Sequence, residues 1–289
     1  MPRWGTTLIA GLILTMVPWS LYCGQEQVTK EKPVLDVPYE PTTYGIAEAM
    51  LSMANVTSRD LVYDLGCGDG RIVIMAAKER GARGVGVDID PARIKESREN
   101  AKAEGVGGAV RFFEQNLFET DIAEATVVML YLWPEVNLRL RPKLLRELKP
   151  GTRIVSHSHT MGDWQADDRR TVENHNLYLF TVPLNVSGTW QWIGRDGGPV
   201  TLRLTQKFQK VHGSVRFSGR EIELIDCILR GNSLSFSVKR RPGERKEILL
   251  FEGRVSGDVI EGTITEGTGG TVSRWNAVRD ASTVVSIAQ

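Results

Sequence analysis

The stretch Val62-Tyr63-Asp64-Leu65-Gly66-Cys67-Gly68-Asp69-Gly70-Arg71 decides how the rest of the chain is interpreted. The apolar residues 61–65 predict a buried parallel strand, and the helical pattern that begins at Arg71 predicts a helix directly after a turn. Glycine at every second position of that turn permits unusual backbone angles and the close approach of a ligand. A strand, a glycine-rich loop and a helix N-terminus in this order form a nucleotide-binding edge of an open α/β sheet.

The spacing of the glycines and the acidic residues around them narrows the class of nucleotide. The pattern from Asp64 to Gly70 is D-x-G-x-G-x-G, whereas a dinucleotide-binding fingerprint is G-x-G-x-x-G. Asp69 lies inside the loop, where its negative charge would repel a phosphate. The next predicted strand, 84–87, ends in Asp88, which is placed to accept hydrogen bonds from ribose hydroxyls. These features favour a cationic adenosine ligand without phosphates.

The glycine loop, Asp88 and the helix start at Asp90-Pro91 together resemble the class I S-adenosylmethionine (SAM) methyltransferases. The resemblance implies an α/β fold with a Rossmann-like methyltransferase domain and SAM as the cofactor. A Rossmann-like domain that binds another nucleotide is the alternative. The predicted cofactor-binding residues in this part of the chain are Asp64, Gly66, Cys67, Gly68, Gly70, Arg71, Asp88 and Ile89.

Segments on either side of the loop supply the other predicted cofactor contacts. Thr42 precedes a helical pattern, where a threonine either caps the helix or, with its neighbours, closes over the methionine end of the cofactor. After the predicted strand 109–113, class I enzymes usually carry an acidic residue that binds the adenine amino group. This chain has Asn116 there, whose amide oxygen accepts in the same way. These predicted contacts are Tyr39, Pro41, Thr42, Asn116, Leu117 and Leu130.

The chain from Pro41 to about Ser156 is similar to two groups of protein lysine methyltransferases. One is the non-SET histone H3 methyltransferase of the telomeric-silencing type, and the other is the mitochondrial type that modifies an ATP synthase subunit or the adenine nucleotide carrier. The similarity implies that a protein lysine is the methyl acceptor. It rests on Pro41-Thr42, Asp64 to Gly70, Pro134-Glu135-Val136 and Pro150-Gly151-x-Arg153-Ile154-Val155-Ser156.

Two departures from these and other methyltransferases concern the acceptor. The chain lacks the N-P-P-Y type tetrapeptide with which amino-methylating enzymes hold a planar amide or base, and this disfavours adenine and glutamine acceptors. Histone-type enzymes have an asparagine and aromatic residues before their Pro-Glu, whereas this chain has Leu130-Tyr131-Leu132-Trp133. Its substrate channel therefore differs from theirs.

The predicted catalytic residues are Tyr131, Trp133 and Glu135. Methyl transfer from a sulfonium is an in-line displacement, and an acceptor amine must lose its proton in a narrow channel, for which Tyr131 and Trp133 supply aromatic faces. The alternative is that both rings are core residues at a strand end. Glu135 either orients the amine or stabilises the start of the next helix.

His157 and His159 form an H-x-H pair at the end of the next predicted strand. They line the mouth of the substrate site, act as a base, or contribute to a metal site. No third metal ligand is evident from the spacing, and the three cysteines match no zinc motif, so we predict no metal.

The first 24 residues resemble a secretory signal or a membrane anchor in composition. Arg3 precedes an apolar run over residues 8–23, and Cys23 permits lipidation as an alternative. We expect export or membrane association through residues 1–24, followed by a linker over 25–40. The side of the membrane is left open, because export would separate the chain from the cytosol, where SAM is made.

The sequence pattern changes at about residue 185. We therefore divide the rest of the chain into a methyltransferase domain over 41–184, a smaller antiparallel all-β domain over 185–280 and a tail over 281–289. Short alternating runs between Gly, Asn and Asp turns predict a β-meander, closed as a barrel or stacked as a sandwich. Gly188-x-Trp190 and the late Arg279 resemble the start and the terminal arginine of small calycin-type barrels. This domain packs on the catalytic domain, recognises a protein, or binds an apolar ligand.

The sequence thus predicts a SAM-dependent methyltransferase that acts on a protein lysine. A small-molecule or lipid methyltransferase is one alternative, and a SAM-binding envelope module without turnover is another. Lys and Arg total 36 and Asp and Glu total 35, so the balance of charge gives no reason to expect a nucleic-acid partner.

Overall fold

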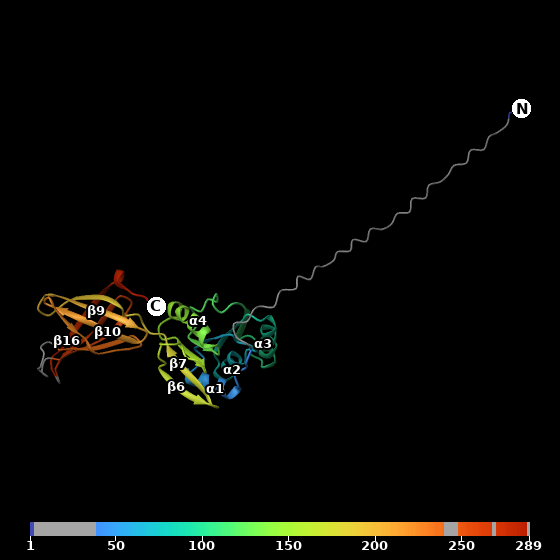
Figure 1. Cartoon of the computed structure of the whole chain (residues 1–289), viewed down its shortest axis with the longest axis horizontal. Coiled ribbons are helices and arrows are strands. Elements are labelled where there is room, and N and C mark those ends of the chain that lie inside the picture. The colour runs from blue at the N-terminus through green and yellow to red at the C-terminus, as the bar shows by residue number, and fades with distance from the viewer. Residues whose placement is uncertain (3–38, 240–247, 268–269, 288–289) are drawn as a thin grey trace. The chain divides into compact units, whose positions relative to one another are not determined.

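The computed structural model describes residues 1–2, 39–239, 248–267 and 270–287 of the chain (Figure 1). The predicted signal or anchor over 1–24, apart from its first two residues, and most of the predicted linker over 25–40 lie outside the described residues. Within the described ranges, no helix is long and apolar enough to cross a membrane. The described residues form two separate β-sheets with helices beside the first.

The first sheet has seven strands in the order β3-β2-β1-β4-β5-β7-β6. Its parallel strands are β1 (Leu61–Leu65), β2 (Arg83–Asp88), β3 (Val110–Glu114), β4 (Val127–Leu130) and β5 (Arg153–His157). Strand β7 (His175–Thr181) runs antiparallel to β5, and β6 (Asp168–Val172) runs antiparallel to β7. The order confirms the predicted Rossmann-like class and brings the carboxyl ends of β1 to β5 to one edge of the sheet.

Four helices accompany this sheet: α1 (Tyr44–Met53), α2 (Arg71–Arg80), α3 (Pro91–Ala103) and α4 (Pro134–Glu147). Apolar residues of α1, α2 and α3 share one buried cluster with Val62 of β1, whereas those of α4 share a second cluster with the adjacent Tyr63. Because successive strand residues point to opposite faces, α4 covers one face of the sheet and the other three helices cover the opposite face.

Local chemistry explains where these helices begin. The Thr43 hydroxyl accepts from the backbone N–H of Ile46 and caps α1, and the Asp90 carboxylate caps α3 by accepting from Ala92 N–H. The amphipathic pattern predicts a helix over 138–148, but α4 begins four residues earlier, at Pro134. Proline at the first helical position has its φ angle already set and needs no hydrogen-bond partner for its nitrogen, so the helix starts there.

The structure changes one further expectation for this part of the chain and confirms another. The polar pattern of residues 164–174 predicts a loop or short helix, but β6 pairs with β7 at the sheet edge. An exposed edge strand carries few apolar residues, which is why its pattern resembles that of a loop. The antiparallel strand predicted over 177–183 is confirmed as β7.

The second sheet has nine antiparallel strands in the order β11-β10-β9-β8-β16-β15-β14-β13-β12. Their bounds are β8 (Gly188–Ile193), β9 (Pro199–Lys207), β10 (Lys210–Phe217), β11 (Arg220–Glu223), β12 (Ile225–Arg230), β13 (Ser233–Lys239), β14 (Ile248–Ser256), β15 (Val259–Glu266) and β16 (Val272–Asp280). The antiparallel meander is therefore confirmed. A closed barrel is not supported, because no ladder joins the edge strands β11 and β12 among the described residues.

Aromatic side chains fill the interior of the second sheet. Phe236 and Phe251 stack with ring centroids 4.7 Å apart, and Trp275 meets Phe251 edge-on at 5.3 Å. Trp192 lies 5.0 Å from Trp275, and Trp190 is fully buried in the same cluster. Close packing of this kind gives the sheet a core of its own.

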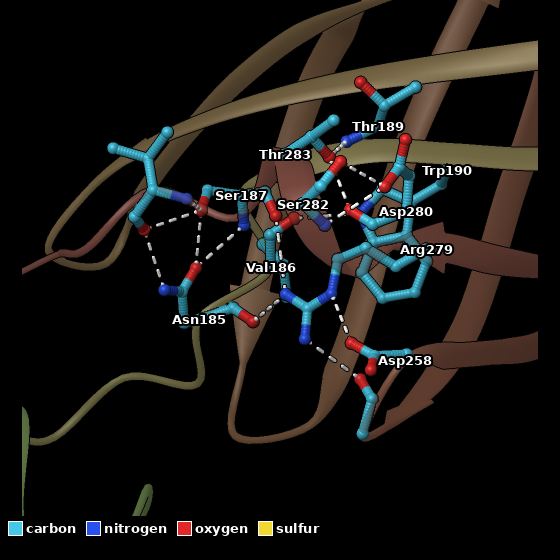
Figure 2. Close-up of polar contacts among 12 residues, drawn as sticks. Asn185, Val186, Ser187, Thr189, Trp190, Asp258, Arg279, Asp280, Ser282 and Thr283 are labelled. Carbon is cyan, nitrogen blue, oxygen red and sulfur yellow. Dashed lines mark hydrogen bonds and ion pairs between the residues drawn. The ribbon is translucent and has the colours of Figure 1, made fainter.

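Arg279 of β16 connects three parts of the second sheet (Figure 2). Its guanidinium lies over the Trp190 ring, 4.8 Å from the centroid, and its Nη1 donates to the Asn185 carbonyl at 2.9 Å. Its Nε donates to Asp258 at 2.8 Å, in the turn between β14 and β15. Trp190 and Arg279, the two residues of the calycin-like pattern, are thus in contact, and this contact joins both ends of the domain sequence.

The described part of the predicted tail is held in place. Thr283 accepts from the backbone N–H of Thr189 at 2.8 Å, and the Ser187 hydroxyl donates to the Val285 carbonyl at 2.8 Å (Figure 2). The sequence predicts that the tail over 281–289 is frayed, but side chains beside β8 form hydrogen bonds with the backbone of Val285. The sequence pattern alone carries no sign of these long-range contacts.

We predict that Arg279→Gln lowers the free energy of unfolding of the second sheet by about 2 kcal/mol, because it removes a charged hydrogen-bond donor that is only 10% exposed and leaves its partners unpaired. Urea unfolding followed by tryptophan fluorescence measures this change. The control is Arg216→Gln, which removes an exposed ion pair with Glu221 and should cost below about 0.5 kcal/mol. Equal effects of the two substitutions would contradict the role given to Arg279.

Candidate active site

A cavity opens at the edge of the first sheet where the parallel strands end. Gly66 and Gly68 follow β1, Asp88 ends β2, Asn116 follows β3 and Tyr131 follows β4. The predicted site residues that line this cavity are Tyr39, Pro41, Thr42, Asp64, Gly66, Cys67, Gly68, Arg71, Asp88, Ile89, Asn116, Leu117, Tyr131 and Trp133. The sheet therefore brings together residues that are up to 94 positions apart between Tyr39 and Trp133.

Three predicted site residues do not line the cavity. Leu130 is fully buried in the cluster under α4, because its side chain points to that face of β4. Glu135 lies exposed in the first turn of α4, where its charge favours the helix start. Gly70 faces the interior, since a Cβ placed on it would lie 2.6 Å from the Phe112 ring. The assignment of these three residues to the site stays a prediction that the cavity lining does not support.

The glycines of the loop are required by backbone geometry and by close packing. Gly66 and Gly68 have φ angles of +91° and +52°, in the left-handed region that side chains disfavour. A Cβ on Gly68 would also approach the Tyr39 ring to 2.4 Å. The loop backbone is therefore in direct contact with the segment 39–42, which covers this part of the cavity.

Asp88 is held rigidly beside the loop. Its Oδ2 accepts from the Gly68 N–H and its Oδ1 accepts from the Asp90 N–H, both at 2.9 Å. Each carboxylate oxygen keeps a further lone pair, so Asp88 can still accept hydrogen bonds from two neighbouring hydroxyls of a ligand. This arrangement matches the predicted role of Asp88 at a ribose.

Asp64 is the least compensated charged group of the cavity. Its carboxyl is 3% exposed, and no donor among the described residues forms a hydrogen bond with it. Burial and the negative charges of Asp88 and Asp69 raise the pKa of Asp64 to about 8. A cationic group of a ligand in the cavity would supply the missing partner, because a buried carboxylate is stable only when paired.

Asp69 has a partner within the chain. Its carboxylate accepts from Arg71 Nε at 2.9 Å and from Arg71 Nη2 at 2.6 Å. Arg71 Nη1 donates to the Thr42 carbonyl at 2.7 Å, so the pair ties the glycine loop to the segment 39–42. The negative charge of Asp69 is thus partly balanced, and Arg71 acts here by holding that segment.

The end of the cavity near β4 and β5 contains aromatic rings. Tyr131 stacks on His157 with centroids 3.8 Å apart, and Thr42 Oγ1 lies 3.2 Å from His157 Nδ1. His157 is 1% exposed, and burial together with nearby His175 and His159 lowers the pKa of His157 to about 4. His157 is therefore neutral at pH 7 and adds no positive charge behind Tyr131.

Thr42 and Trp133 each lie near the start of a helix, α1 and α4 respectively. Thr43, not Thr42, caps α1, so the Thr42 hydroxyl is free to contact His157. Trp133 precedes α4, is 49% exposed and lines the cavity at its outer side. Of the two alternatives for Trp133, the structure therefore excludes a buried core position.

The predicted adenine contact differs in detail from the expectation. Asn116 Oδ1 accepts from the Phe118 N–H at 3.0 Å and so forms a turn, which leaves one lone pair for a ligand. The adjacent Gln115 also lines the cavity and was missed. Its position directly after a predicted strand was the available signal for it.

Other cavity residues were also missed in the sequence. Arg93 lies over the Tyr39 ring at 4.6 Å, and Glu40 lines the cavity together with Tyr131, whose pKa its charge helps to raise. His159 lines the cavity, as one alternative for the H-x-H pair anticipated, whereas His157 lies behind Tyr131. The lining residues that the sequence analysis did not assign to the site are Glu40, Asp69, Ile72, Val87, Asp90, Arg93, Gln115, Leu132 and Val136.

Comparison with known proteins agrees with this geometry. Residues 64–168 match the ANTKMT methyltransferase domain family. A protein-lysine N-methyltransferase of Saccharolobus islandicus (strain REY15A) is 46% identical over 151 residues, which cover 50% of this chain and 94% of that protein. The adenine nucleotide translocase lysine N-methyltransferase of Mus musculus is 33% identical over 132 residues, covering 45% of this chain and 57% of that protein.

Among solved structures, an RNA methyltransferase from Salinibacter ruber in complex with S-adenosyl-L-homocysteine is 50% identical and has a TM-score of 0.50. The match covers 51% of this chain and 96% of that one. The residues of our cavity fit the same class of ligand. The glycines leave room for it, Asp88 offers two acceptors for a ribose, and Asp64 offers an unpaired carboxylate for an ammonium group.

We predict that S-adenosylhomocysteine releases close to one proton when it binds at pH 7. Asp64 is mostly protonated there in the free protein, and the ligand's ammonium group favours its ionised form. Affinity should therefore rise up to tenfold per pH unit as pH increases toward 8, and level off above it. Calorimetry in buffers of different ionisation enthalpy counts the released protons.

The Asp64→Asn variant should bind S-adenosylhomocysteine at least tenfold more weakly. Its binding should release no proton, because the substitution removes the carboxyl group to which we assign the released proton. Asp121→Asn, at an exposed position away from the cavity, is the control and should behave as the unchanged protein. Proton release that persists in Asp64→Asn would show that another group is linked to binding.

Proposed function

The chain belongs to the family of class I SAM-dependent protein-lysine N-methyltransferases, and we propose that it methylates a lysine side chain of a protein. The observation that carries this proposal is the pairing, in one cavity, of an acidic cofactor end with an aromatic acceptor end. Asp64 and Asp88 stand at the first end, and Tyr131 and Trp133 at the second. The lysine methylation named for the relatives from Saccharolobus islandicus and Mus musculus supports the same acceptor.

The residues around the cofactor have distinct tasks. When bound, SAM supplies a methyl group on a positively charged sulfur, which a neutral amine displaces in line. The loop from Gly66 to Gly70 admits the ligand, Asp88 binds the ribose hydroxyls, and Asp64 neutralises the ammonium of the methionine part. Arg71 keeps the segment 39–42 closed over the cavity through the Thr42 carbonyl. Holding the ligand in a fixed orientation supplies much of the rate acceleration, because the reacting groups are then already aligned for the transfer.

The residues at the acceptor end restrict what can enter. Tyr131 and Trp133 place aromatic rings beside the acceptor, which favour a cation and exclude water. The neutral His157 fixes the Tyr131 ring by stacking. An aliphatic chain with a terminal amine, such as lysine, suits this combination of apolar walls and cation-binding faces.

Two other acceptor classes are less well supported. A small apolar molecule or a lipid cupped by the second sheet would need an open interior, whereas aromatic rings occupy that interior. RNA is named for the relative from Salinibacter ruber. The excess of basic over acidic residues in this chain is only one, which gives no general attraction to a polyanion.

We predict that methyl-labelled SAM transfers its label to protein lysine when the chain is incubated with lysate from its own source. Fractionation into protein, RNA and lipid, followed by mass spectrometry of the labelled peptides, locates the methyl group. Asp88→Ala should reduce labelling at least a hundredfold, because it removes the ribose acceptors and the anchor of the Gly68 N–H. Glu79→Gln, on the exposed surface of α2, is the control and should label normally.

Label in RNA or lipid would replace the lysine proposal while keeping the methyltransferase activity.

We also propose, from the sequence of residues 1–24, that these residues direct the chain to a membrane. Comparing the membrane and soluble fractions of the full chain with those of a chain that lacks these residues tests this point, and equal distributions would refute it.

A further inference from the structure

Glu40 is a carboxylate of the cavity that neither the cofactor assignments nor the predicted catalytic residues include. It lines the same cavity as Tyr131, and its negative charge contributes to the raised pKa of that phenol. We propose that Glu40 binds the ammonium group of the acceptor lysine at the methyl-transfer end of the cavity. This inference rests on the proposed function and adds the residue that selects a cationic acceptor.

The cavity contains two separate groups of carboxylates. The charges of Asp88 and Asp69 contribute to the raised pKa of Asp64. Asp69 lies in the glycine loop after β1, and Asp88 ends β2. Glu40 instead acts on Tyr131, which directly follows β4. One negative group thus faces the cofactor end, and a separate carboxylate faces the aromatic end. Two cations, one on the cofactor and one on the acceptor, match this division.

The surroundings of Tyr131 favour a cation in front of its ring. Desolvation and the charge of Glu40 raise the pKa of Tyr131, so the phenol stays protonated. The other titratable groups here are three histidines: His157 stacks on Tyr131, His175 meets His157 edge-on at 4.9 Å, and His159 lines the cavity. His157 is neutral at pH 7, so it does not offset the charge of Glu40.

The position of Glu40 also suits the proton that the acceptor must lose. Lysine enters as an ammonium, and one proton moves from its nitrogen to the Glu40 carboxylate, which leaves a neutral amine with a free lone pair and a carboxylic acid. The positive charge of the bound cofactor favours this transfer by lowering the pKa of the amine. Glu40 is exposed on its outer side, so the acid returns its proton to water.

A binding experiment tests Glu40 apart from turnover. The protein is saturated with S-adenosylhomocysteine and titrated, by NMR, with Nα-acetyl-lysine amide and with Nα-acetyl-norleucine amide, which lacks the charged amine. We expect the unchanged protein to bind the lysine probe at least fivefold more tightly than the norleucine probe. Glu40→Gln should reduce this preference to less than twofold, and Tyr131→Phe should reduce it partly, because it removes a polar hydroxyl group from the end of the cavity that Glu40 serves.

Two controls accompany these variants. Glu79→Gln removes one negative charge from the exposed surface of α2 and should keep the full preference. The affinity of Glu40→Gln for S-adenosylhomocysteine should stay within twofold of the unchanged protein, because Asp64 and Asp88 hold that ligand. A loss of more than tenfold in this affinity, with the lysine preference retained, would move Glu40 to the cofactor and overturn the proposal.

The remaining outcomes separate this inference from the proposed function. A Glu40→Gln variant that keeps the lysine preference, or an unchanged protein without any preference, overturns the role of Glu40. If labelled lysine is nevertheless found in the acceptor experiment, the methylation of lysine stands and only Glu40 is wrongly assigned. If the label is found elsewhere, both proposals fail together.

Discussion

The buried carboxyl group of Asp64 is the constraint on which the rest of the site depends. It lies at the end of β1, close to the charges of Asp88 and Asp69, and no described residue donates a hydrogen bond to it. A protein tolerates such a group when it is neutral or when a ligand brings the opposite charge. The raised pKa of Asp64 and the arrangement of Arg71, which pairs with Asp69, leave the place beside Asp64 for a cation from outside the chain.

The order of the strands determines which group of the ligand each part of the cavity can bind, and so it orients the ligand along the sheet edge. Asn116 follows β3, Asp88 ends β2, the glycines follow β1, and Tyr131 follows β4, in the spatial order β3-β2-β1-β4. The cavity therefore runs from an adenine end, past the ribose and the ammonium, to an aromatic end. The segment 39–42 covers it and is held at Thr42 by two contacts, with Arg71 at the Thr42 carbonyl and with His157 at the Thr42 hydroxyl. Cofactor binding and the acceptor end are thus connected through one short segment.

The sequence was sufficient for the parts of this site that depend on local structure. The strand, the glycine loop and the acidic end of the next strand have a fixed spacing, so Gly68 and Asp88 could be placed from the pattern alone. Leu130 could not, because all four residues of β4 are buried and show no alternation that distinguishes its two faces. Glu40 lies in a proline-containing segment without periodicity, and its contact with Tyr131 is formed only in the tertiary structure. Asp69 was correctly identified as a charge in the loop, but its pairing with Arg71 depends on side-chain geometry.

The most direct test of the account is a crystal structure of the chain with S-adenosylhomocysteine. We predict that the ribose contacts Asp88, that the ammonium of the ligand contacts Asp64, and that the sulfur faces the end of the cavity formed by Tyr131 and Glu40. A ligand bound with its sulfur toward Asn116, or in a place away from the glycine loop, would contradict the direction that we assign to the cavity. Either of those results would also remove the basis for placing the methyl acceptor beside Tyr131.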